Sequence, residues 1–198
     1  MTRVVAITGG IGSGKTTLSK YLKKKGFLVH ESDEVVASIY KRPNNSFKDF
    51  IKKNISIEAL KKNKINKKHV ANVIFSDKNK KNKLEKYIHN KVRISRENFI
   101  KKGLRSKKKI VFVDIPLLFE KKLEKSFHFI ICILSSKKNR AKRVLKNKKF
   151  SKTTLNKIFN SQTSDKERRK KSQFIIYNNK TKKDFIFSFE KLLLEILA

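Results

Sequence analysis

Apolar residues along this chain gather in short blocks separated by long polar stretches. Five of these blocks are brief runs rich in β-branched and aromatic residues, the pattern of buried strands in a parallel sheet. They occupy residues 3–8, 27–32, 110–114, 127–134 and 174–178. Helical patterns lie between most of them. We therefore predict an α/β fold with a doubly wound, parallel, five-stranded sheet.

The N-terminal stretch predicts one strand–loop–helix–strand unit. The run at 3–8 ends at a glycine, as a buried strand before a tight loop does. Apolar positions then recur at helical spacing from Lys15 to Lys25, and Gly26 follows as a helix-ending glycine. The next strand, at 27–32, completes the unit.

A long charged stretch, residues 34–107, shows helical periods and no convincing buried strand. We interpret it as a helical insertion, whose first helix is broken by Pro43. Later helices are predicted at 137–149, 152–163 and 183–197, the second with Ser151 as its N-cap.

Four of the chain's six glycines fall within residues 9–14. Gly9, Gly14, Lys15 and Thr16 have the Gly-x4-Gly-Lys-Thr spacing of a Walker A motif. Glycines let such a loop turn its backbone N–H groups inward around a phosphate, and the following helix adds its positive N-terminus. The motif predicts a bound nucleoside triphosphate, with the lysine on the β- and γ-phosphates and the threonine hydroxyl on Mg²⁺. The ATP-binding residues expected in this phosphate loop are Gly10, Ile11, Gly12, Ser13, Gly14, Lys15, Thr16 and Thr17.

A second junction between a strand and a helix places Asp33 just after the strand at 27–32. In small kinases with this loop, the acceptor lies opposite the nucleotide at that junction. A carboxylate there can orient and deprotonate an acceptor hydroxyl. On the residues alone, a helix N-cap is an equally good interpretation of Asp33.

Charge is extreme: 52 lysines and arginines stand against 16 acidic residues, a net charge of +36. Such a charge suggests nucleic-acid binding. The lysines are scattered, however, and the heavy use of Lys, Asn, Ile and Phe, whose codons are A/T-rich, favours compositional drift. We therefore expect no specific nucleic-acid partner.

One cysteine, Cys132, excludes a disulfide framework, and no apolar run approaches the 18 residues of a membrane span. The glycines also arrive too early in the sequence for a signal peptide. A cytoplasmic protein is the expectation.

Three segments together resemble the dephospho-CoA kinase family: TGGIGSGKTT, ESD at 31–33 and DIPLLFE at 114–120. The resemblance runs over nearly the whole chain, and DIPLLFE is its most specific element. Further matches are Leu84, Glu85, His89, Arg93, Arg143, Ser151, Gln162 and Arg168. The resemblance implies transfer of the γ-phosphate of ATP to the ribose 3′-hydroxyl of dephospho-CoA.

The same resemblance implies one kinase domain in three parts. The core would comprise residues 1–33, 108–139 and 172–198, the substrate-binding insertion residues 34–107, and the lid residues 140–171. ATP and dephospho-CoA are the expected partners, with Mg²⁺ as cofactor, no membrane, and a monomer or weak homo-oligomer as the assembly.

Catalytic roles follow from the resemblance. Lys15 and Asp33 are catalytic candidates, Asp33 as the base. Arg143 is the candidate that neutralises the transferred phosphoryl group, and Arg140, one turn earlier, is a second candidate that would bind ATP. Asp114 would hold a Mg²⁺-bound water or orient the acceptor, unless it only caps its strand.

Acceptor-binding roles are also implied. Arg93 would bind the pyrophosphate of the acceptor, and His89 is either a second contact or an ordinary helix histidine. Leu117, together with Leu118 and Phe119, would form an apolar wall beside the acceptor, with core packing as the alternative.

The chain departs from the family pattern at supporting positions. Glu31 replaces an aspartate, Asn147-Lys148 replaces an Arg-Asp pair, and Asn90 replaces a proline. Gln173 and Tyr177 stand where acidic residues are usual. These changes affect the expected efficiency and the lid more than the identity of the reaction.

Two alternatives remain open at this stage. One is another small kinase with the same phosphate loop, which acts on a nucleotide or a metabolite. The other is a basic RNA-binding protein with this loop and no kinase activity. The lysine runs lack the interleaved aromatic residues typical of single-strand stacking platforms, which argues against the second.

Overall fold

The computed structural model describes residues 2–61, 63–147 and 150–197, and the chain divides into two compact units. The first contains the residues up to Glu31 and from Ile100 onward, and the second spans Ser32–Phe99. Each unit has its own hydrophobic core. The long helix α5, Lys78–Arg105, contributes residues to both units.

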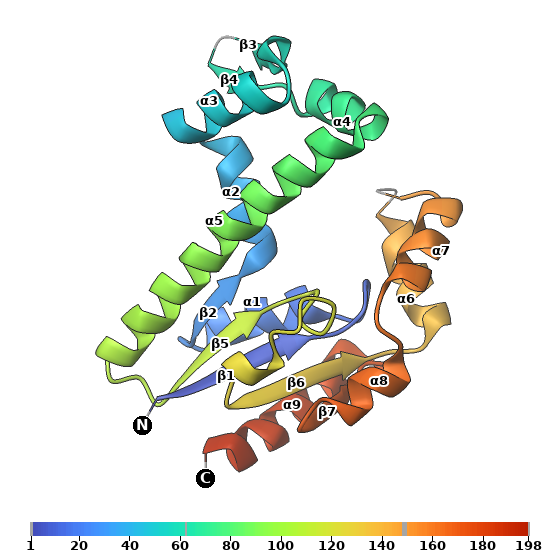
Figure 1. Cartoon of the computed structure of the whole chain (residues 1–198). Helices are drawn as coiled ribbons and strands as arrows, with labels where there is room; N and C mark the ends of the chain where they lie inside the picture. Colours follow the sequence, from blue (N-terminus) through green and yellow to red (C-terminus); the bar gives the residue numbers. More distant parts are fainter. Residues whose placement is uncertain (1, 62, 148–149, 198) are drawn as a thin grey trace. The chain divides into compact units, whose positions relative to one another are not determined.

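A five-stranded parallel sheet forms the centre of the first unit, as predicted (Figure 1). Its spatial order is β2-β5-β1-β6-β7. The strands are β1 (Arg3–Thr8), β2 (Leu28–Glu31), β5 (Ile110–Asp114), β6 (Phe129–Leu134) and β7 (Phe174–Tyr177). From β1 the chain leaves toward β2, whereas from β6 it leaves toward β7 on the opposite side. The carboxyl ends of β1 and β6 therefore form the switch point at which such sheets bind ligands.

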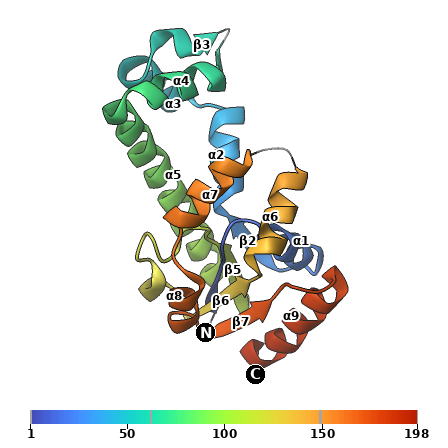
Figure 2. The same cartoon turned by 90° about the vertical axis from the view of Figure 1, so that its right-hand side faces the viewer.

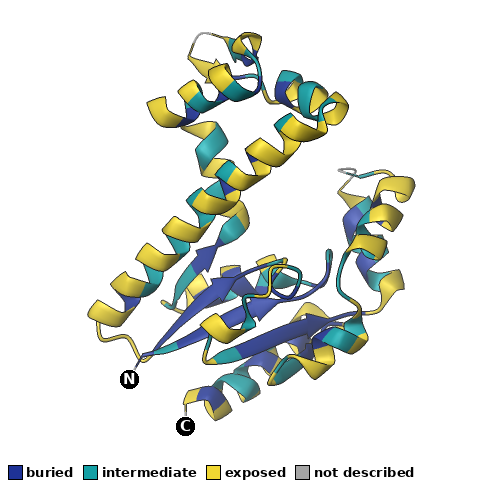
Figure 3. Cartoon of the chain, viewed as in Figure 1, coloured by how far each residue is buried: buried dark blue, intermediate teal, exposed yellow. Residues whose placement is uncertain are grey.

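The first unit also contains the helices α1 (Lys15–Lys24), α6 (Lys137–Lys146), α7 (Lys152–Ser161), α8 (Asp165–Lys170) and α9 (Lys182–Leu197). Helix α1 packs beside β2, α8 beside β6 and α9 beside β7, and α6 packs on α7. Figure 2 shows α9 alongside β7, and Figure 3 shows the strands as the most deeply buried part of the chain. Phe185 and Phe189 of α9 are buried against Phe112 and Ile7 of the sheet.

The second unit is helical, with a small two-stranded sheet. It contains α2 (Ser32–Lys41), α3 (Asn45–Asn54), α4 (Lys67–Ser76) and most of α5, with the short strands β3 (Leu60–Lys61) and β4 (Lys64–Ile65). As predicted, α2 ends before Pro43. Its core contains an aromatic stack in which Tyr87 lies 5.3 Å from Phe47 and 4.3 Å from Phe50, between ring centroids.

Three features differ from the sequence-based expectation. The strands β3 and β4 were not predicted, because two residues are too few to show alternation. The helix α8 was also missed, since its sequence DKERRK has no apolar residue to reveal a period. The helix α6 ends at Lys146, with Asn147 as its C-cap. No helix within the described ranges is both long and apolar enough to cross a membrane.

Candidate active site

The phosphate loop follows β1 directly and leads into α1, as the sequence predicted. Gly14 is the N-cap of α1 and has the left-handed φ of 115°, which favours glycine. A side chain there would also collide with Asn178, because a Cβ would lie 2.3 Å from Nδ2. The loop thus requires glycine at this position for its backbone angle and for its close neighbour.

The side chain of Lys15 folds back onto the first residues of the phosphate loop. Its Nζ donates to the carbonyl of Gly9 at 2.8 Å and to that of Gly10 at 3.4 Å. Ser13 is 1 % exposed, so its side chain turns into the protein and not toward solvent. The loop therefore offers backbone N–H groups and one ammonium group to a ligand.

A pocket opens at this loop, which we call the loop pocket. It is lined by Ile11, Gly12, Gly14, Lys15, Thr16, Thr17, Arg143, Val144, Asn147 and Phe150. All these residues belong to the first unit. Six of the eight residues predicted for the loop line it, whereas Gly10 and Ser13 are buried behind it.

Two carboxylates lie side by side at the ends of neighbouring strands. Glu31 of β2 pairs in register with Asp114 of β5, and both are buried. Glu31 forms an ion pair with Lys23 at 2.7 Å. Asp114 Oδ2 accepts a hydrogen bond from Ser19 Oγ at 3.3 Å, and Ser19 lies one turn after Thr16 on α1. Asp114 therefore lies beside the second turn of α1.

This arrangement fits a divalent cation. A threonine hydroxyl and a carboxylate are hard oxygen ligands of the kind that Mg²⁺ prefers. The Thr16 side chain is exposed at the loop pocket, where it is available to a ligand.

Arginine 143 of α6 forms a hydrogen bond with the phosphate loop. Its Nη1 donates to the carbonyl of Gly12 at 3.2 Å and to Ser135 Oγ at 3.1 Å. Its Nη2 donates to the carbonyl of Asn178 at 2.8 Å and to its Oδ1 at 3.2 Å. The guanidinium group thus lies at the loop pocket, held by protein oxygens.

Arginine 140 lies against Gly10, on the buried side of the loop. It is 8 % exposed, and its Nη2 donates to Asp165 at 3.2 Å. Its guanidinium group also lies over the ring of Phe159, 5.1 Å from the centroid. Burial lowers the pKa of Arg140, while Asp165 counteracts that shift. Arg140 does not line the loop pocket.

The remaining predicted residues belong to the second unit, apart from Leu117. Asp33 is exposed in the first turn of α2, two residues after the end of β2. Leu117 is 40 % exposed, whereas Leu118 and Phe119 are buried. Of the proposed apolar wall, only Leu117 faces solvent, and the other two are core residues.

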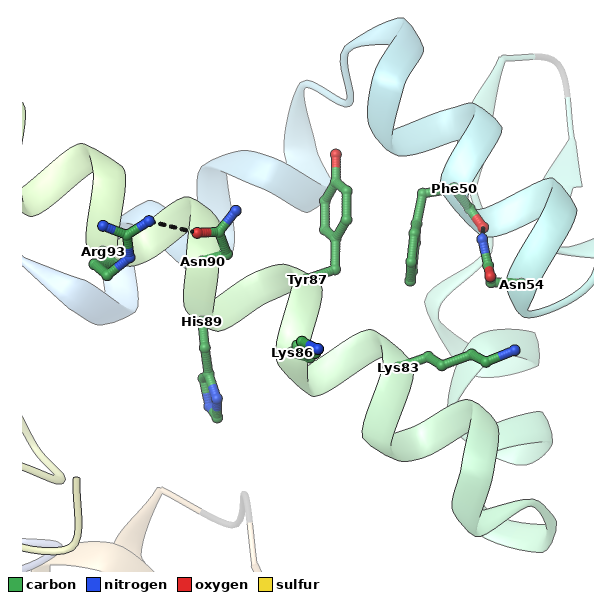
Figure 4. Close-up of a pocket in the computed structure, with 8 residues that line it drawn as sticks. All are labelled: Phe50, Asn54, Lys83, Lys86, Tyr87, His89, Asn90 and Arg93. Atoms are coloured by element: carbon green, nitrogen blue, oxygen red, sulfur yellow. Dashed lines mark hydrogen bonds between the residues drawn. The ribbon is translucent and has the colours of Figure 1, made fainter.

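Histidine 89 and Arg93 line a pocket on α5 together with Phe50, Asn54, Lys83, Lys86, Tyr87 and Asn90. Figure 4 shows Arg93 beside Asn90, while His89 points away from Tyr87. Arg93 donates to Asn90 Oδ1 at 2.9 Å and forms an ion pair with Glu97 at 2.9 Å. This pocket is cationic, with two lysines and an arginine and no carboxylate in its lining.

Some departures from the family pattern have a visible structural role. Gln173 Oε1 accepts from the backbone N–H of Ile130 at 2.9 Å, which extends the pairing of β6 and β7. Tyr177 is 49 % exposed under the guanidinium of Arg169. Lys148, which with Asn147 replaces the family's Arg-Asp pair, lies outside the described residues.

Sequence reasoning missed Asn178, which contacts both the loop and Arg143, and gave Glu120 no role. Asn178 Nδ2 donates to the carbonyl of Ser13 at 2.8 Å. Glu120 Oε1 accepts from Thr163 N at 2.7 Å and from Arg168 at 3.3 Å. The sequence did offer a signal for each residue. Asn178 belongs to the Asn-Asn pair after the last strand, and Glu120 is the last residue of the DIPLLFE segment.

Comparison with known proteins gives one consistent result. A family model described as dephospho-CoA kinase matches residues 3–184. A dephospho-CoA kinase from Fusobacterium nucleatum is 35% identical over 191 residues, which is 95% of each chain. One from Buchnera aphidicola is 35% identical and covers 90% of this chain and 83% of its own.

Solved structures agree. The dephospho-CoA kinase from Campylobacter jejuni has a TM-score of 0.75 at 27% identity, over 99% of this chain and 98% of that one. A shikimate kinase from Acinetobacter baumannii has a TM-score of 0.52 at 14% identity, over 98% and 94%, and shares the fold alone.

Proposed function

The chain belongs to the dephospho-CoA kinase family, and we propose that it transfers the γ-phosphoryl group of ATP to the ribose 3′-hydroxyl of dephospho-CoA. ADP and CoA are the products. The observation that carries the proposal is the loop pocket, which combines the phosphate loop, Lys15 and Arg143 in one unit. We place the enzyme in the cytoplasm, as a monomer or weak homo-oligomer.

ATP binds with its phosphates in the loop pocket. The backbone N–H groups of the loop and the N-terminus of α1 hold the anionic phosphates. Lys15 exchanges its bond to the Gly9 carbonyl for the β- and γ-phosphates. The Thr16 hydroxyl would ligate Mg²⁺ and the Asp114 carboxylate would hold it through a bound water, and the ion would neutralise phosphate charge.

Phosphoryl transfer requires charge neutralisation more than covalent chemistry, because negative charge spreads over the transferred oxygens. Arg143 supplies that charge from α6, where four protein contacts already orient its guanidinium group. Arg140 is better assigned to the support of the loop than to ATP, since it is buried against Gly10 and outside the loop pocket.

The acceptor binds through the second unit. Asp33 accepts the proton of the ribose hydroxyl as general base, supported by its exposed position in the first turn of α2, two residues after β2. Arg93, with Lys83 and Lys86 in the same cationic pocket, binds the pyrophosphate of dephospho-CoA. His89 is a weaker candidate than Arg93, because it points away from the aromatic side of this pocket (Figure 4).

The test is ADP production from purified protein and Mg-ATP, with dephospho-CoA, with shikimate, and without acceptor. We expect turnover with dephospho-CoA alone. Asp33→Asn removes the base while keeping the size of the side chain, and we expect at least about a 100-fold loss of kcat. Asp49→Asn, the same change at an exposed site on α3, is the control and should retain turnover.

Two outcomes would overturn parts of the proposal. Folded protein that binds ATP but gives no acceptor-dependent ADP would exclude the kinase assignment. Turnover that survives in the Asp33→Asn variant would keep the kinase and remove Asp33 as base.

A further inference from the structure

The segment between α7 and α8, residues 162–164, contacts the phosphate loop through the side chain of Gln162. Helix α7 ends at Ser161, and Gln162 follows as its C-cap with extended backbone. Gln162 Oε1 accepts a hydrogen bond from the backbone N–H of Ile11 at 3.0 Å. The donor and the acceptor lie 151 residues apart in the sequence. A lid residue thus satisfies one of the loop's own amides.

Glu120, the last residue of the DIPLLFE segment, holds the same segment between α7 and α8 through the backbone of Thr163. Glu120 Oε1 accepts from the backbone N–H of Thr163, the neighbour of Gln162, at 2.7 Å. It also accepts from Arg168 at 3.3 Å. Arg168 is 1 % exposed, so this ion pair is shielded from solvent. Glu120 therefore holds the backbone from which Gln162 extends.

Acidic and basic side chains form a connected series of ion pairs around this segment. Arg168 contacts both Glu120 and Asp165, and Asp165 also contacts Arg140. The two arginines lie against Gly10, where a Cβ would be 2.1 Å from Arg140 Nη1 and 3.1 Å from Arg168 Nη1. Gly10 is thus packed on one side against this network, close to where the loop leaves β1.

We propose that Gln162 is a positioning residue for ATP, that it orders the phosphate loop through the Ile11 amide, and that Glu120 acts on the loop by holding Gln162. This inference rests on the proposed use of the loop for ATP. A loop that is ordered before binding loses less conformational entropy when the phosphates arrive. Loss of the Gln162 bond leaves the fold intact and weakens nucleotide binding.

The first experiment is calorimetric binding of Mg-ATP to Gln162→Ala and to a matched control, Gln173→Ala. Gln173 makes an equivalent bond, from the Ile130 N–H at 2.9 Å, but at the start of β6. Because each variant loses one hydrogen bond, we expect similar losses of thermal stability. We expect Gln162→Ala to raise the Kd for ATP about 3- to 10-fold and Gln173→Ala to leave it within about 2-fold.

The second experiment separates positioning from general damage. In turnover with dephospho-CoA, Gln162→Ala should raise the KM for ATP and leave the KM for the acceptor unchanged. Glu120→Gln keeps an oxygen for the Thr163 N–H, and should therefore bind ATP more tightly than Glu120→Ala. Once Glu120 is alanine, adding Gln162→Ala should cause little further loss, since the two act through one contact.

Equal ATP affinity in Gln162→Ala and wild type overturns the inference, and so does an equal loss in both glutamine variants. Additive losses for Glu120 and Gln162 overturn the claim that one acts through the other. Binding of Mg-ATP is measured without acceptor, so these outcomes are independent of the substrate assignment. Failure of the wild type to bind Mg-ATP would instead overturn the proposed function.

Discussion

Asparagine 178 joins the phosphate loop to the arginine proposed to stabilise the transferred phosphoryl group. Its Nδ2 donates to the Ser13 carbonyl, and its Oδ1 accepts from Arg143. Asn178→Asp keeps the acceptor but places a second oxygen against the Ser13 carbonyl. We expect kcat/KM for ATP to fall at least about 10-fold, because a buried bond becomes a repulsion. Steady-state kinetics at varied ATP measures this.

The neighbouring Asn179 provides the control for that variant. Its Oδ1 accepts from Ser136 N at 2.8 Å and from Ser135 Oγ at 3.2 Å, away from the Ser13 carbonyl. Asn179→Asp should therefore keep kcat/KM within about 3-fold of wild type. Equal effects of the two substitutions would show that charge near α6, and not the Ser13 contact, is responsible.

Cysteine 132 is the chain's single thiol and lies fully buried in β6. Burial raises its pKa from 9.0 to about 11, with Arg168 and Ser172 acting in the opposite direction. At pH 8 the native thiolate fraction is therefore about 100-fold below that of the unfolded chain. We expect alkylation by iodoacetamide to be slower than in urea by at least that factor, as measured by mass spectrometry.

The sign of this shift also predicts an effect of pH on stability. A thiol whose pKa is raised by folding contributes full stability below its unfolded pKa of 9.0, and this contribution is lost as the pH rises toward about 11. Cys132→Ser should flatten that part of the stability curve in urea titrations. Rapid native alkylation at pH 8 would contradict the burial of the thiol.

Only part of this residue-level picture could be read from the sequence. The loop residues were identifiable because their spacing is local and each has a chemical reason. Asn178 and Gln162 act on amides and carbonyls that lie 165 and 151 residues away. No local pattern encodes such contacts, since any polar side chain of similar length is equally plausible until the sheet order is known.

The packing of α9 on the sheet can be tested by substitution, because this helix carries one buried and one exposed phenylalanine. Phe189 is fully buried, with its ring 6.3 Å from that of Phe112 and 6.2 Å from that of Tyr21, while Phe187 on the same helix is 56% exposed. Phe189→Ala should lower the free energy of unfolding by about 3–5 kcal/mol. Phe187→Ala should change it by less than about 1 kcal/mol. Urea denaturation of both variants measures the difference.

Similar costs for the two phenylalanines would mean that α9 is not docked on the sheet through this face. The register of α9 was predictable because its apolar residues recur at helical spacing over 183–197. The same method failed for α8 and for β3 and β4, which are too short or too charged to show a period. A regular period of apolar residues thus made α9 predictable, and its absence left these shorter elements undetected.

At the scale of the whole molecule, each unit has a separate apolar core. The first is built on the sheet around Phe112 and Ile131, and the second around Phe47, Ile51 and Leu84. Residues 34–107 were predicted as an insertion because their periods are helical, and the compact second unit spans Ser32–Phe99. The difference arises at α5, which is one continuous helix although its last residues pack with the sheet. A sequence pattern cannot show where such a helix passes from one core to another.

The net charge of +36 also belongs to this scale, and it leads to a prediction about RNA. If the charge is compositional, RNA binds through many scattered lysines, and each phosphate contact releases counterions. Affinity for a labelled single-stranded RNA should then fall at least about 1,000-fold between 50 and 200 mM KCl, by fluorescence anisotropy. Lys15→Ala should abolish turnover and leave RNA binding unchanged, because it removes one of 52 cationic side chains. An affinity that persists at 200 mM KCl would instead require a shaped RNA site, since diffuse charge alone is screened there within about 8 Å.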